Sequence, residues 1–432
     1  MLNRVLLKKV EIMEVLKIIL KILYYSIDII IMAYFLYYFV TGLFVFKKSK
    51  GKNKIRKYKP TKKMAVLIAA RNESSVIGHL LESLNKQDYP KDLYDVFVIP
   101  NNCTDNTEEV SREKGAKIIN CTVPVKSKGD VLKFTFNFML NNHPEYEAYC
   151  IFDADNIVHP KFLRRMNDAL CSGFRVAQCN RDTKNPSDSW VSSCYSLFYL
   201  VQNFFFNEAR MKMGWSSSIN GTGFVISRDV IKERGFSTVT MTEDIEFAAQ
   251  CALNNERIAY VKEAITYDEQ PLSFSASWKQ RKRWSVGTIQ CMNKYSGKLI
   301  KTWLKEGIPQ ALDMGLFFLA PIIQVVTFVV IFMLFMYNLL GLNVSDVIKF
   351  AYNNKMMSMA LAYICTVGTA AFVVMLEKKG FAKTFKGIFT LAIFMVSWIP
   401  INIICMVKKD CKWEPIKHDR VVDIDSILNK EK

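Results

Sequence analysis

The chain has 432 residues, enough for a domain of more than about 200 residues with further segments around it. Its 58 Lys and Arg against 40 Asp and Glu give a formal charge of +18, which suits a nucleic acid, an anionic lipid or a phosphorylated substrate. The eleven cysteines form no CxxC pair, which excludes a disulfide framework and favours reduced thiols facing a cytosol.

The N-terminal part, residues 1–46, is predicted to combine an amphipathic and a transmembrane helix. Residues 1–21 mix lysines with Leu, Val and Ile and are expected to lie along the membrane interface. Residues 23–46 are almost wholly apolar, and about twenty such residues suffice to span a bilayer. The run is too long for a cleavable signal peptide. The basic linker at 47–63 predicts that the chain enters the cytoplasm there.

The central region, 64–270, alternates between short β-branched runs and stretches that are apolar at helical spacing. Strands are predicted at 63–70, 94–100, 117–123 and 146–152, and helices at 74–87 and 107–116. This alternation predicts an α/β domain around a mainly parallel sheet. Ligands of such sheets bind at the carboxyl ends of the strands, which here read ARNE, NNCTDNT and DADN.

The sequence FDADN places two carboxylates at the end of an apolar strand. Asp153 and Asp155 are two residues apart, so in an extended chain both side chains point the same way and can reach one divalent cation. A solvated turn is the alternative interpretation of an Asp-x-Asp sequence.

The sequence TMTEDIEFAAQ places Glu243 and Asp244 before an apolar helical pattern. One interpretation is helix capping by Thr242, with acidic residues in the first turn. The other is that one carboxylate is a general base. Upstream, the glycines of NGTG (220–223) would let the backbone approach a ligand closely.

A cationic cluster lies just before the C-terminal apolar region. Lys279, Arg281, Lys282 and Arg283 are followed at once by Trp284. A positive-inside anchor with an interfacial tryptophan explains this composition. A site that binds an anion beside a ring-shaped ligand explains it as well.

Three further apolar segments close the chain, at 311–340, 356–376 and 387–407. If all three crossed the membrane, the basic loop before the last segment and the basic tail, 408–432, would lie on opposite sides, against the positive-inside tendency. We therefore expect one segment of the region 311–407 not to cross simply. The last segment is the candidate because Pro400 interrupts it.

The order of these motifs resembles the membrane-integrated, processive family 2 glycosyltransferases, which include the cellulose, mixed-linkage β-glucan, chitin, hyaluronan and poly-N-acetylglucosamine synthases. The matching sequences are AARNE (69–73), KSKGD (126–130), DAD (153–155), NGTG (220–223), TED (242–244) and QRKRW (280–284). The resemblance implies a Rossmann-like α/β cytosolic domain of the glycosyltransferase A type. It also implies interfacial helices at 271–310, an N-terminal transmembrane helix and a C-terminal α-helical transmembrane bundle.

The resemblance also implies a role for each motif residue. Asp244, beside Glu243, would be the catalytic base, and Asp155 with Asp153 would hold Mg²⁺ or Mn²⁺. The acceptor would be bound by Gly221, Thr222, Gln280 and Trp284. The UDP-sugar donor would be bound by Ala70, Arg71, Glu73, Asn101, Lys128, Asp153 and Arg283, and by Trp413 and Lys417 of a gating-loop-like tail segment. Many relatives carry an acidic residue where this chain has Asn101.

The implied activity is that of a processive, inverting β-glycosyltransferase that polymerises a 1,4- or mixed 1,3;1,4-linked β-glucan from UDP-glucose. It would be a multi-pass protein of the plasma (inner) membrane with a cytoplasmic catalytic domain. Its partners would be the growing polysaccharide, membrane lipids and accessory export or cell-envelope proteins, with no nucleic acid. Three alternatives remain: a poly-N-acetylglucosamine, chitin or hyaluronan type synthase that uses UDP-GlcNAc, a non-processive transferase to a lipid phosphate, and a basic non-enzymatic membrane scaffold.

Overall fold

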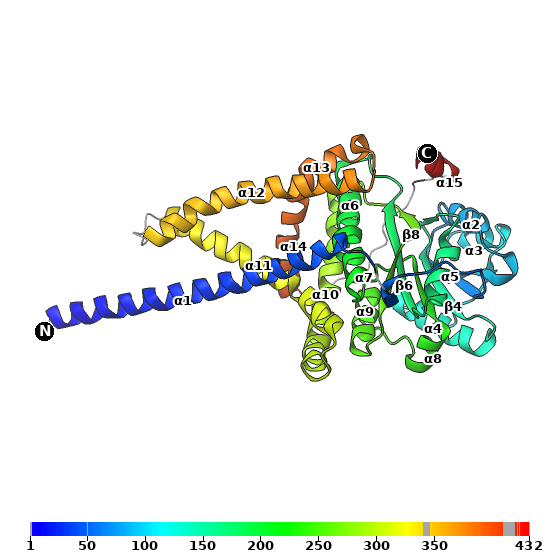
Figure 1. Cartoon of the computed structure of the whole chain (residues 1–432), viewed down its shortest axis with the longest axis horizontal. Helices are drawn as coiled ribbons and strands as arrows, with labels where there is room; N and C mark the ends of the chain where they lie inside the picture. Colours follow the sequence, from blue (N-terminus) through cyan, green and yellow to red (C-terminus); the bar gives the residue numbers. More distant parts are fainter. Residues whose placement is uncertain are drawn as a thin grey trace.

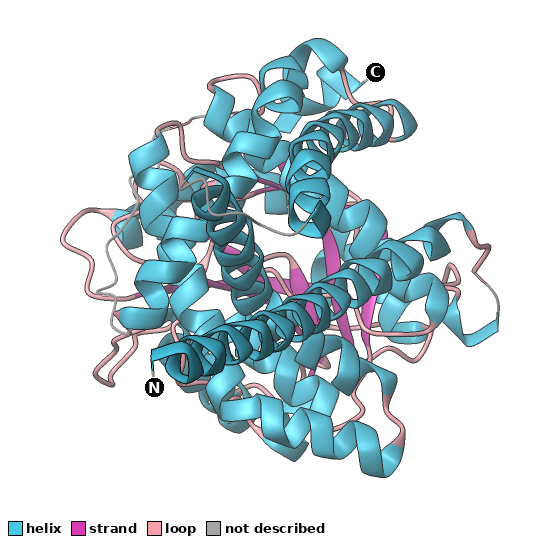
Figure 2. Ribbon diagram, turned by 90° about the vertical axis from the view of Figure 1, so that its left-hand side faces the viewer, coloured by secondary structure: helices cyan, strands magenta, loops and turns pink. Residues whose placement is uncertain are grey.

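The computed structural model describes residues 2–49, 51–339, 346–408, 420, 422 and 424–431. An α/β domain lies at one end of the molecule, and the long helices α1 (Leu2–Leu43), α11 (Pro309–Leu339) and α12 (Asp346–Leu376) project from it (Figure 1). Seen from the N-terminal side, the strands lie behind these helices (Figure 2). The C-terminal helix α15 (Ile424–Glu431) returns to the α/β domain.

The α/β domain is built on one eight-stranded sheet with the order β3-β2-β1-β4-β7-β6-β8-β5. Strands β3, β2, β1 and β4 are parallel, β6 and β8 are parallel, and β7 runs antiparallel to both of its neighbours. The expected parallel sheet is thus found in the first half, whereas the second half is mixed because β7 is reversed. The strands are β1 (Met64–Ala70), β2 (Tyr94–Pro100), β3 (Lys117–Ile118), β4 (Ala148–Asp153), β5 (Ile157–Val158), β6 (Val176–Thr183), β7 (Phe224–Ser227) and β8 (Ile258–Asp268).

Helices cover both faces of this sheet, which explains why its central strands are apolar throughout rather than alternating. On one face α2 (Ile77–Asn85) and α5 (Phe162–Cys171) pack on the sheet. On the other, α4 (Lys128–Asn142), α8 (Arg228–Arg234) and α9 (Glu243–Leu253) do so. The register pairs Ala70 with Pro100 and Ala69 with Asp153, so the polar segments after β1, β2 and β4 meet at one edge.

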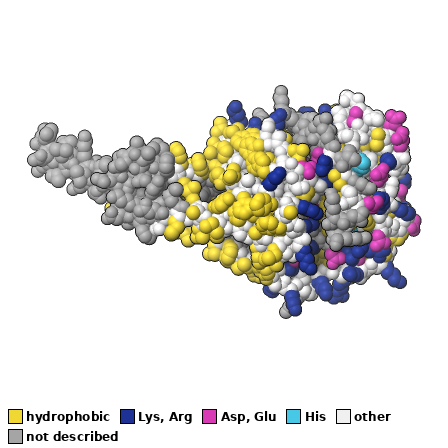
Figure 3. All heavy atoms as spheres, turned by 90° about the horizontal axis from the view of Figure 1, so that it is seen from above, with side chains coloured by type: hydrophobic (Ala, Val, Ile, Leu, Met, Phe, Trp, Pro, Cys, Tyr) yellow, Lys and Arg dark blue, Asp and Glu magenta, His cyan; other side chains and the backbone are white. Residues whose placement is uncertain are grey.

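The remaining helices connect this domain to the apolar part of the chain. They are α3 (Thr107–Glu113), α6 (Trp190–Val201), a π-helix (Gln202–Glu208), α7 (Ala209–Met213), α10 (Phe274–Glu306), α13 (Phe381–Val396) and α14 (Trp398–Val407). Judged on length and composition, four stretches within the described residues are able to cross a membrane: Ile22–Phe46, Pro309–Met333, Met359–Leu376 and Phe381–Val407. Hydrophobic side chains gather over this part of the surface, and charged ones over the α/β domain (Figure 3).

The N-terminal helix differs from the sequence-based expectation. We expected residues 1–21 to lie along the membrane interface, whereas α1 runs without a break from Leu2 to Leu43 and so continues the apolar stretch. The physical reason is that no proline interrupts it and its single glycine is Gly42, one residue before its end. Near its end α1 contacts the α/β domain, where Gly42 lies against Phe205 of the π-helix.

The last apolar segment is broken, in the region where Pro400 led us to expect it. Helix α13 ends at Val396, and α14 begins at Trp398 with Pro400 in its first turn, where proline is tolerated. The loop before α13 contacts the α/β domain through Lys379, whose Nζ lies 2.5 Å from Asp182 Oδ2. The end of α14 lies against α10, and Cys405 Sγ donates to the carbonyl of Lys282 (3.6 Å). The segment therefore starts against the α/β domain and ends against α10 (Figure 1).

Candidate functional site

A single cavity of about 530 Å³ lies at the carboxyl ends of the strands and continues between α10, α11 and α14. It brings together residues that are up to 333 positions apart in the sequence, from Ala69 to Asn402. Thirteen of the residues predicted from the sequence line it: Ala70, Arg71, Glu73, Asn101, Lys128, Asp153, Asp155, Gly221, Glu243, Asp244, Gln280, Arg283 and Trp284.

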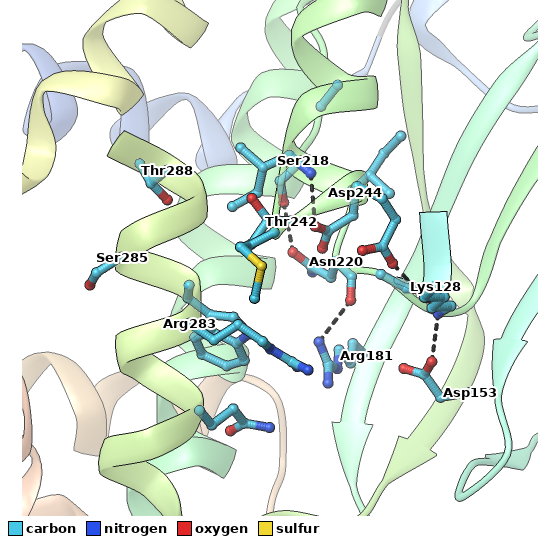
Figure 4. Close-up of a pocket in the computed structure, with 18 of the residues that line it drawn as sticks. Lys128, Asp153, Arg181, Ser218, Asn220, Thr242, Asp244, Arg283, Ser285 and Thr288 are labelled. Carbon is cyan, nitrogen blue, oxygen red and sulfur yellow. Dashed lines mark hydrogen bonds and ion pairs between the residues drawn. The ribbon is translucent and has the colours of Figure 1, made fainter. Parts of the chain in front are cut away.

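Lys128 is the central cation at the sheet end of the cavity. It is the first residue of α4, directly after the N-cap Ser127, which forms a capping box with Asp130. Its Nζ lies 2.5 Å from Asp153 Oδ1 and donates to the carbonyl of Gly221 at 2.7 Å. Burial on its own would raise the pKa of Asp153, but the charge and hydrogen bond of Lys128, together with the charges of Arg181 and Arg283, outweigh burial and lower that pKa. The two groups therefore hold each other in their charged forms (Figure 4).

Asp155 is the carboxylate that remains able to bind a cation. It is 7% exposed, and its oxygens accept from Asn156 Nδ2 (3.4 Å) and the backbone N–H of Glu269 (3.3 Å), with no ion pair among the described residues. No group of three or more His, Cys, Asp or Glu side chains in the described chain is placed to hold a metal unaided. This arrangement fits Mg²⁺ or Mn²⁺, which is commonly held by one or two carboxylates together with substrate phosphates.

Asp268, a buried carboxylate at the end of β8, lies beside Asp155. The sequence analysis missed it. Burial raises its pKa to about 7, and the nearby charge of Asp155 adds to the increase. Its partners are Arg181 at the end of β6 and Asn156, whose Nδ2 donates to it at 3.1 Å.

Arg181 is a cavity residue that the motifs did not indicate. Its guanidinium donates through Nη1 to the carbonyl of Asn220 (2.8 Å) and lies 4.3 Å from the ring centre of Tyr199. Figure 4 shows Arg181 and Arg283 extending towards the same space from opposite sides. Its place at the carboxyl end of a strand could have indicated Arg181. However, the polar sequence CNRDT is not typical of a β-strand.

Glu243 and Asp244 open helix α9 and both line the cavity. Burial raises the pKa of Glu243 to about 7 and also raises the pKa of Asp244. The rise for Asp244 is partly offset by the backbone N–H of Ile245, which donates to its Oδ1 at 2.8 Å. Acidic residues do occupy the first turn of α9, as the capping interpretation predicts. Thr242 is the N-cap residue, but its buried hydroxyl makes no capping hydrogen bond and has no partner among the described residues.

The 220–223 loop is close to Asp244 and is also part of the core. A Cβ on Gly221 would lie 3.2 Å from Asp244 Oδ2. Gly223 has a positive φ, and a Cβ there would lie 2.3 Å from Cys179 Sγ, so its role is close packing rather than ligand approach. Thr222 is fully buried and does not line the cavity; its Oγ1 accepts from the backbone N–H of Asp153 (3.0 Å). The acceptor contact predicted for Thr222 is therefore replaced by a structural one.

The cationic cluster on α10 divides between two faces of the helix. Gln280, Arg283 and Trp284, spaced three and four residues apart, line the cavity. Arg281 points away from it, is fully buried, and donates to Ser397 Oγ at 2.7 Å. One part of the cluster thus serves the site and another part joins α10 to the α13–α14 segment.

Two predicted residues, Trp413 and Lys417, lie outside the described residues. The opposite end of the cavity, away from the sheet, is lined by Gln324 of α11 and by Trp398 and Asn402 of α14. The aromatic stretch around α6 contributes to both core and cavity. Tyr195 is buried, whereas Phe198 lines the cavity.

Comparison with known proteins places this site in a family context. Residues 60–287, just over half of the chain, match the family described as "Glycosyltransferase like family 2". The chain is 26% identical over 254 residues to the "Probable glycosyltransferase YdaM" of Bacillus subtilis, covering 55% of this chain and 58% of that protein. It is 24% identical over 236 residues to the "Beta-monoglucosyldiacylglycerol synthase" of Synechocystis, covering 54% and 49%. The match thus spans half to three fifths of these relatives.

Among solved structures, the chain is similar to the mannosyltransferase PcManGT from Pyrobaculum calidifontis in complex with GDP-Man and Mn²⁺. The TM-score is 0.51 at 17% identity, covering 84% of this chain and 98% of that one. At this identity the likeness concerns the fold, and it confirms the expected glycosyltransferase A-type architecture.

Proposed function

The chain belongs to glycosyltransferase family 2, and from this premise we propose that it transfers a sugar from a UDP-sugar to an acceptor hydroxyl with inversion. The observation that carries the proposal is that the predicted donor residues within the described chain, Asp244 and Trp284 line one cavity. A single displacement requires this arrangement, because the base, the acceptor and the leaving group must lie in line around one carbon.

The sheet end of the cavity suits a nucleoside diphosphate. Asp155, with Asp153 beside it, would hold the Mg²⁺ or Mn²⁺, which would supply neutralisation of the diphosphate charge. Lys128 and Arg283 add positive charge on two sides of the same space. Ala70, Arg71, Glu73 and Asn101 follow β1 and β2, where a nucleoside would lie across the strand ends.

Asp244 is the proposed base. It lies beside Gly221 and shares the cavity with Trp284, whose indole face suits the apolar face of a pyranose ring. Asp244 takes the proton of the acceptor hydroxyl while the sugar–phosphate bond breaks, so an α-linked donor yields a β-linked product. Glu243, with a pKa of about 7, places its Oε1 3.9 Å from Lys128 Nζ. When it is ionised, it offsets part of the positive charge of Lys128.

The acceptor is proposed to be a growing β-glucan, 1,4- or mixed 1,3;1,4-linked, made processively from UDP-glucose. Support comes from the continuation of the cavity from Asp244 to Gln324 and Asn402, which belong to stretches apolar enough to cross a membrane. In this proposal α1, α11 and α12 span the plasma membrane, the α13–α14 segment returns to the cytoplasmic side, and the α/β domain is cytoplasmic. The domain limits proposed from the sequence, 64–270 for the catalytic part and 271–310 for the interfacial helices, follow this division.

A second candidate function is transfer of the sugar to a membrane lipid. The relative from Synechocystis, named as a beta-monoglucosyldiacylglycerol synthase, supports it, as does the closeness of the cavity to apolar helices. A polymer of N-acetylglucosamine made from UDP-GlcNAc is the third, because no cavity residue identified here distinguishes the two sugars.

The test is nucleotide release by the full chain in lipid nanodiscs with Mn²⁺, supplied separately with UDP-glucose, UDP-GlcNAc and GDP-mannose. We expect UDP release with UDP-glucose and a product that a linkage-specific β-glucanase degrades. Release of UDP with a product that extracts as a glycolipid would favour the second candidate. Absence of nucleotide release from either UDP-sugar would contradict the proposal.

A further inference from the structure

The C-terminal helix α15 docks on the α/β domain (Figure 1), beside the segment that carries Asp155. Ile424, the first residue of α15, is 1% exposed and packs against Ile157 of β5 and Tyr267 of β8. Strand β5 has only two residues, begins two positions after Asp155 and lies at the edge of the sheet. Because so short an edge strand is weak on its own, the helix that covers it also steadies the segment around Asp155.

A lysine with a buried side chain joins this segment to the C-terminal part of the chain. Lys184 follows β6, and its side chain is only 2% exposed. Its Nζ donates to the carbonyls of Asp155 at 3.1 Å and of Arg420 at 2.9 Å, and it lies 3.0 Å from Glu269 Oε2. A lysine ammonium has three N–H groups, so each of them is matched by an acceptor from a different part of the chain. One of the three acceptors belongs to the docked tail, by which we mean Arg420 together with α15.

Glu269 is the second link between the docked tail and the predicted cation site. It lines the cavity, and its backbone N–H donates to Asp155 Oδ2 at 3.3 Å. Its two carboxylate oxygens accept from the backbone N–H of Arg420, at 3.2 and 3.1 Å. Lys184 and Glu269 therefore contact Asp155 on one side and the docked tail on the other.

From these contacts we propose that Lys184 and Glu269 are positioning residues, which couple docking of α15 to cation binding at Asp155. Without the docked tail, one N–H of Lys184 loses its acceptor and Glu269 loses the backbone N–H of Arg420, so both hold Asp155 less firmly. Groups that orient a metal-binding side chain typically contribute about 10- to 100-fold to metal affinity. The inference rests on the proposed function, from which the cation is taken. It concerns Arg420 and α15, and not the gating-loop-like segment that precedes them.

The competing explanation is that these contacts only attach α15 to the domain. A coupling between two sites is reciprocal, so the factor that docking adds to cation affinity is also the factor that the cation adds to docking. A purely structural attachment stabilises the domain equally with and without a cation. The two explanations can therefore be separated by binding measurements, without measuring turnover.

The first measurement is Mn²⁺ binding to the full chain in nanodiscs of zwitterionic lipid with UDP present, followed by the EPR signal of free Mn²⁺. Lys184→Met keeps the length of the side chain and removes the ammonium, and we expect it to raise the Kd for Mn²⁺ by about tenfold. In UDP release from UDP-glucose, saturating Mn²⁺ should bring kcat of this variant back to within about twofold of the wild type. Ile424→Ser weakens docking without changing a cavity residue and should raise the Kd by a smaller factor. It keeps the test valid if Lys184→Met lowers the melting temperature.

The second measurement is hydrogen exchange of the backbone amides of α15. Mn²⁺ together with UDP should slow this exchange about tenfold in the wild type, relative to UDP alone, and should not slow it in Lys184→Met. The matched control is Lys212→Met, on α7. Lys212 also contacts one carboxylate, that of Glu208 at 2.7 Å, and one carbonyl, that of Val45, but it does not line the cavity. Its replacement should leave both the Kd for Mn²⁺ and the effect of Mn²⁺ on exchange as in the wild type.

An unchanged Kd for Mn²⁺ in both Lys184→Met and Ile424→Ser would overturn the coupling. Exchange of the α15 amides that does not respond to Mn²⁺ in the wild type would overturn it as well. A wild type that shows both effects but releases no UDP from any UDP-sugar would instead contradict the proposed function and leave the coupling in place.

Discussion

The two ends of the cavity are built in different ways. At the sheet end, charged groups are paired with one another: Lys128 with Asp153, and Arg181 with Asp268. At the membrane end, neutral amides, a hydroxyl and two indoles form the wall. The sheet end suits a ligand whose charge changes during reaction, and the membrane end suits a neutral ligand that has to slide.

This difference predicts how each end of the cavity tolerates amino-acid substitutions. Removing one member of a buried ion pair leaves the other charge unpaired, which costs several kcal/mol. Removing one neutral hydrogen bond costs about 1 kcal/mol. Substitutions of the carboxylates at the sheet end should therefore lower turnover most, whereas those at the membrane end should alter acceptor choice.

The largest effect is expected for Asp244→Asn, because an amide cannot accept the acceptor's proton. We expect kcat to fall by about a thousandfold while UDP still binds, as measured by UDP release and by calorimetric titration with UDP. The matched control is Asp229→Asn, on the exposed first turn of α8, which should behave as the wild type. Undiminished release in Asp244→Asn would remove this residue from the base position.

A smaller loss is expected when the cation site is weakened. Asp155→Asn should lower kcat/KM by about a hundredfold at fixed Mn²⁺ and should recover in part as the Mn²⁺ concentration is raised. Chelation of the wild type with EDTA should stop UDP release, and added Mn²⁺ or Mg²⁺ should restore it. Full activity of the wild type in EDTA would contradict a metal at Asp155.

A further test addresses the contact that positions the base. A Cβ on Gly287 of α10 would lie 2.3 Å from Thr242 Oγ1, so Gly287→Ala must displace the residue before Glu243 and Asp244. We expect kcat to fall by about tenfold, because small displacements of a catalytic group are costly. Gly297→Ala on the same helix meets nothing within 4 Å and should keep full activity, with a gain in stability of up to about 1 kcal/mol.

The smallest effect is a shift of the pH profile. Transfer requires ionised Asp244, so kcat/KM should fall as the pH falls through the pKa of this carboxyl. Arg181 lowers that pKa, so Arg181→Gln should raise it and move the acidic limb to higher pH, whereas Arg181→Lys should not. Arg175, at the other end of the same strand, pairs with Glu256 outside the cavity, and Arg175→Gln should leave the limb in place. If the acidic limb of the kcat/KM profile did not move in Arg181→Gln, Arg181 would not be the residue that lowers the pKa of Asp244.

The sheet end could be predicted largely from the sequence, because its residues follow short apolar strands whose carboxyl ends must meet at one edge. Asp153 lies in such a segment and was found, whereas Lys128, which opens α4, was indicated only by the family resemblance. Arg181 and Asp268 were missed because β6 and β8 end in polar sequences and are brought there by the reversed strand β7. Gly223 was interpreted wrongly, because a glycine in sequence does not reveal whether a ligand or a side chain lies against it.

The membrane end could not be predicted in the same way. Gln324 is a polar residue within an apolar stretch, where such a residue can pair with another helix or line a ligand path. Its partner Asn402 is 78 residues away, and the two meet because the chain breaks at Ser397 and α14 returns against α10. Such contacts depend on helix packing, which no short motif encodes.

The central claim is a single displacement at one carbon, with Asp244 as the base. It is tested most directly by proton NMR of the first glycoside formed from UDP-glucose and cellotriose, recorded before any later equilibration. We predict a β-anomeric proton in the wild type and no product in Asp244→Asn. An α-linked product, or a β-linked product formed equally well by Asp244→Asn, would contradict the claim.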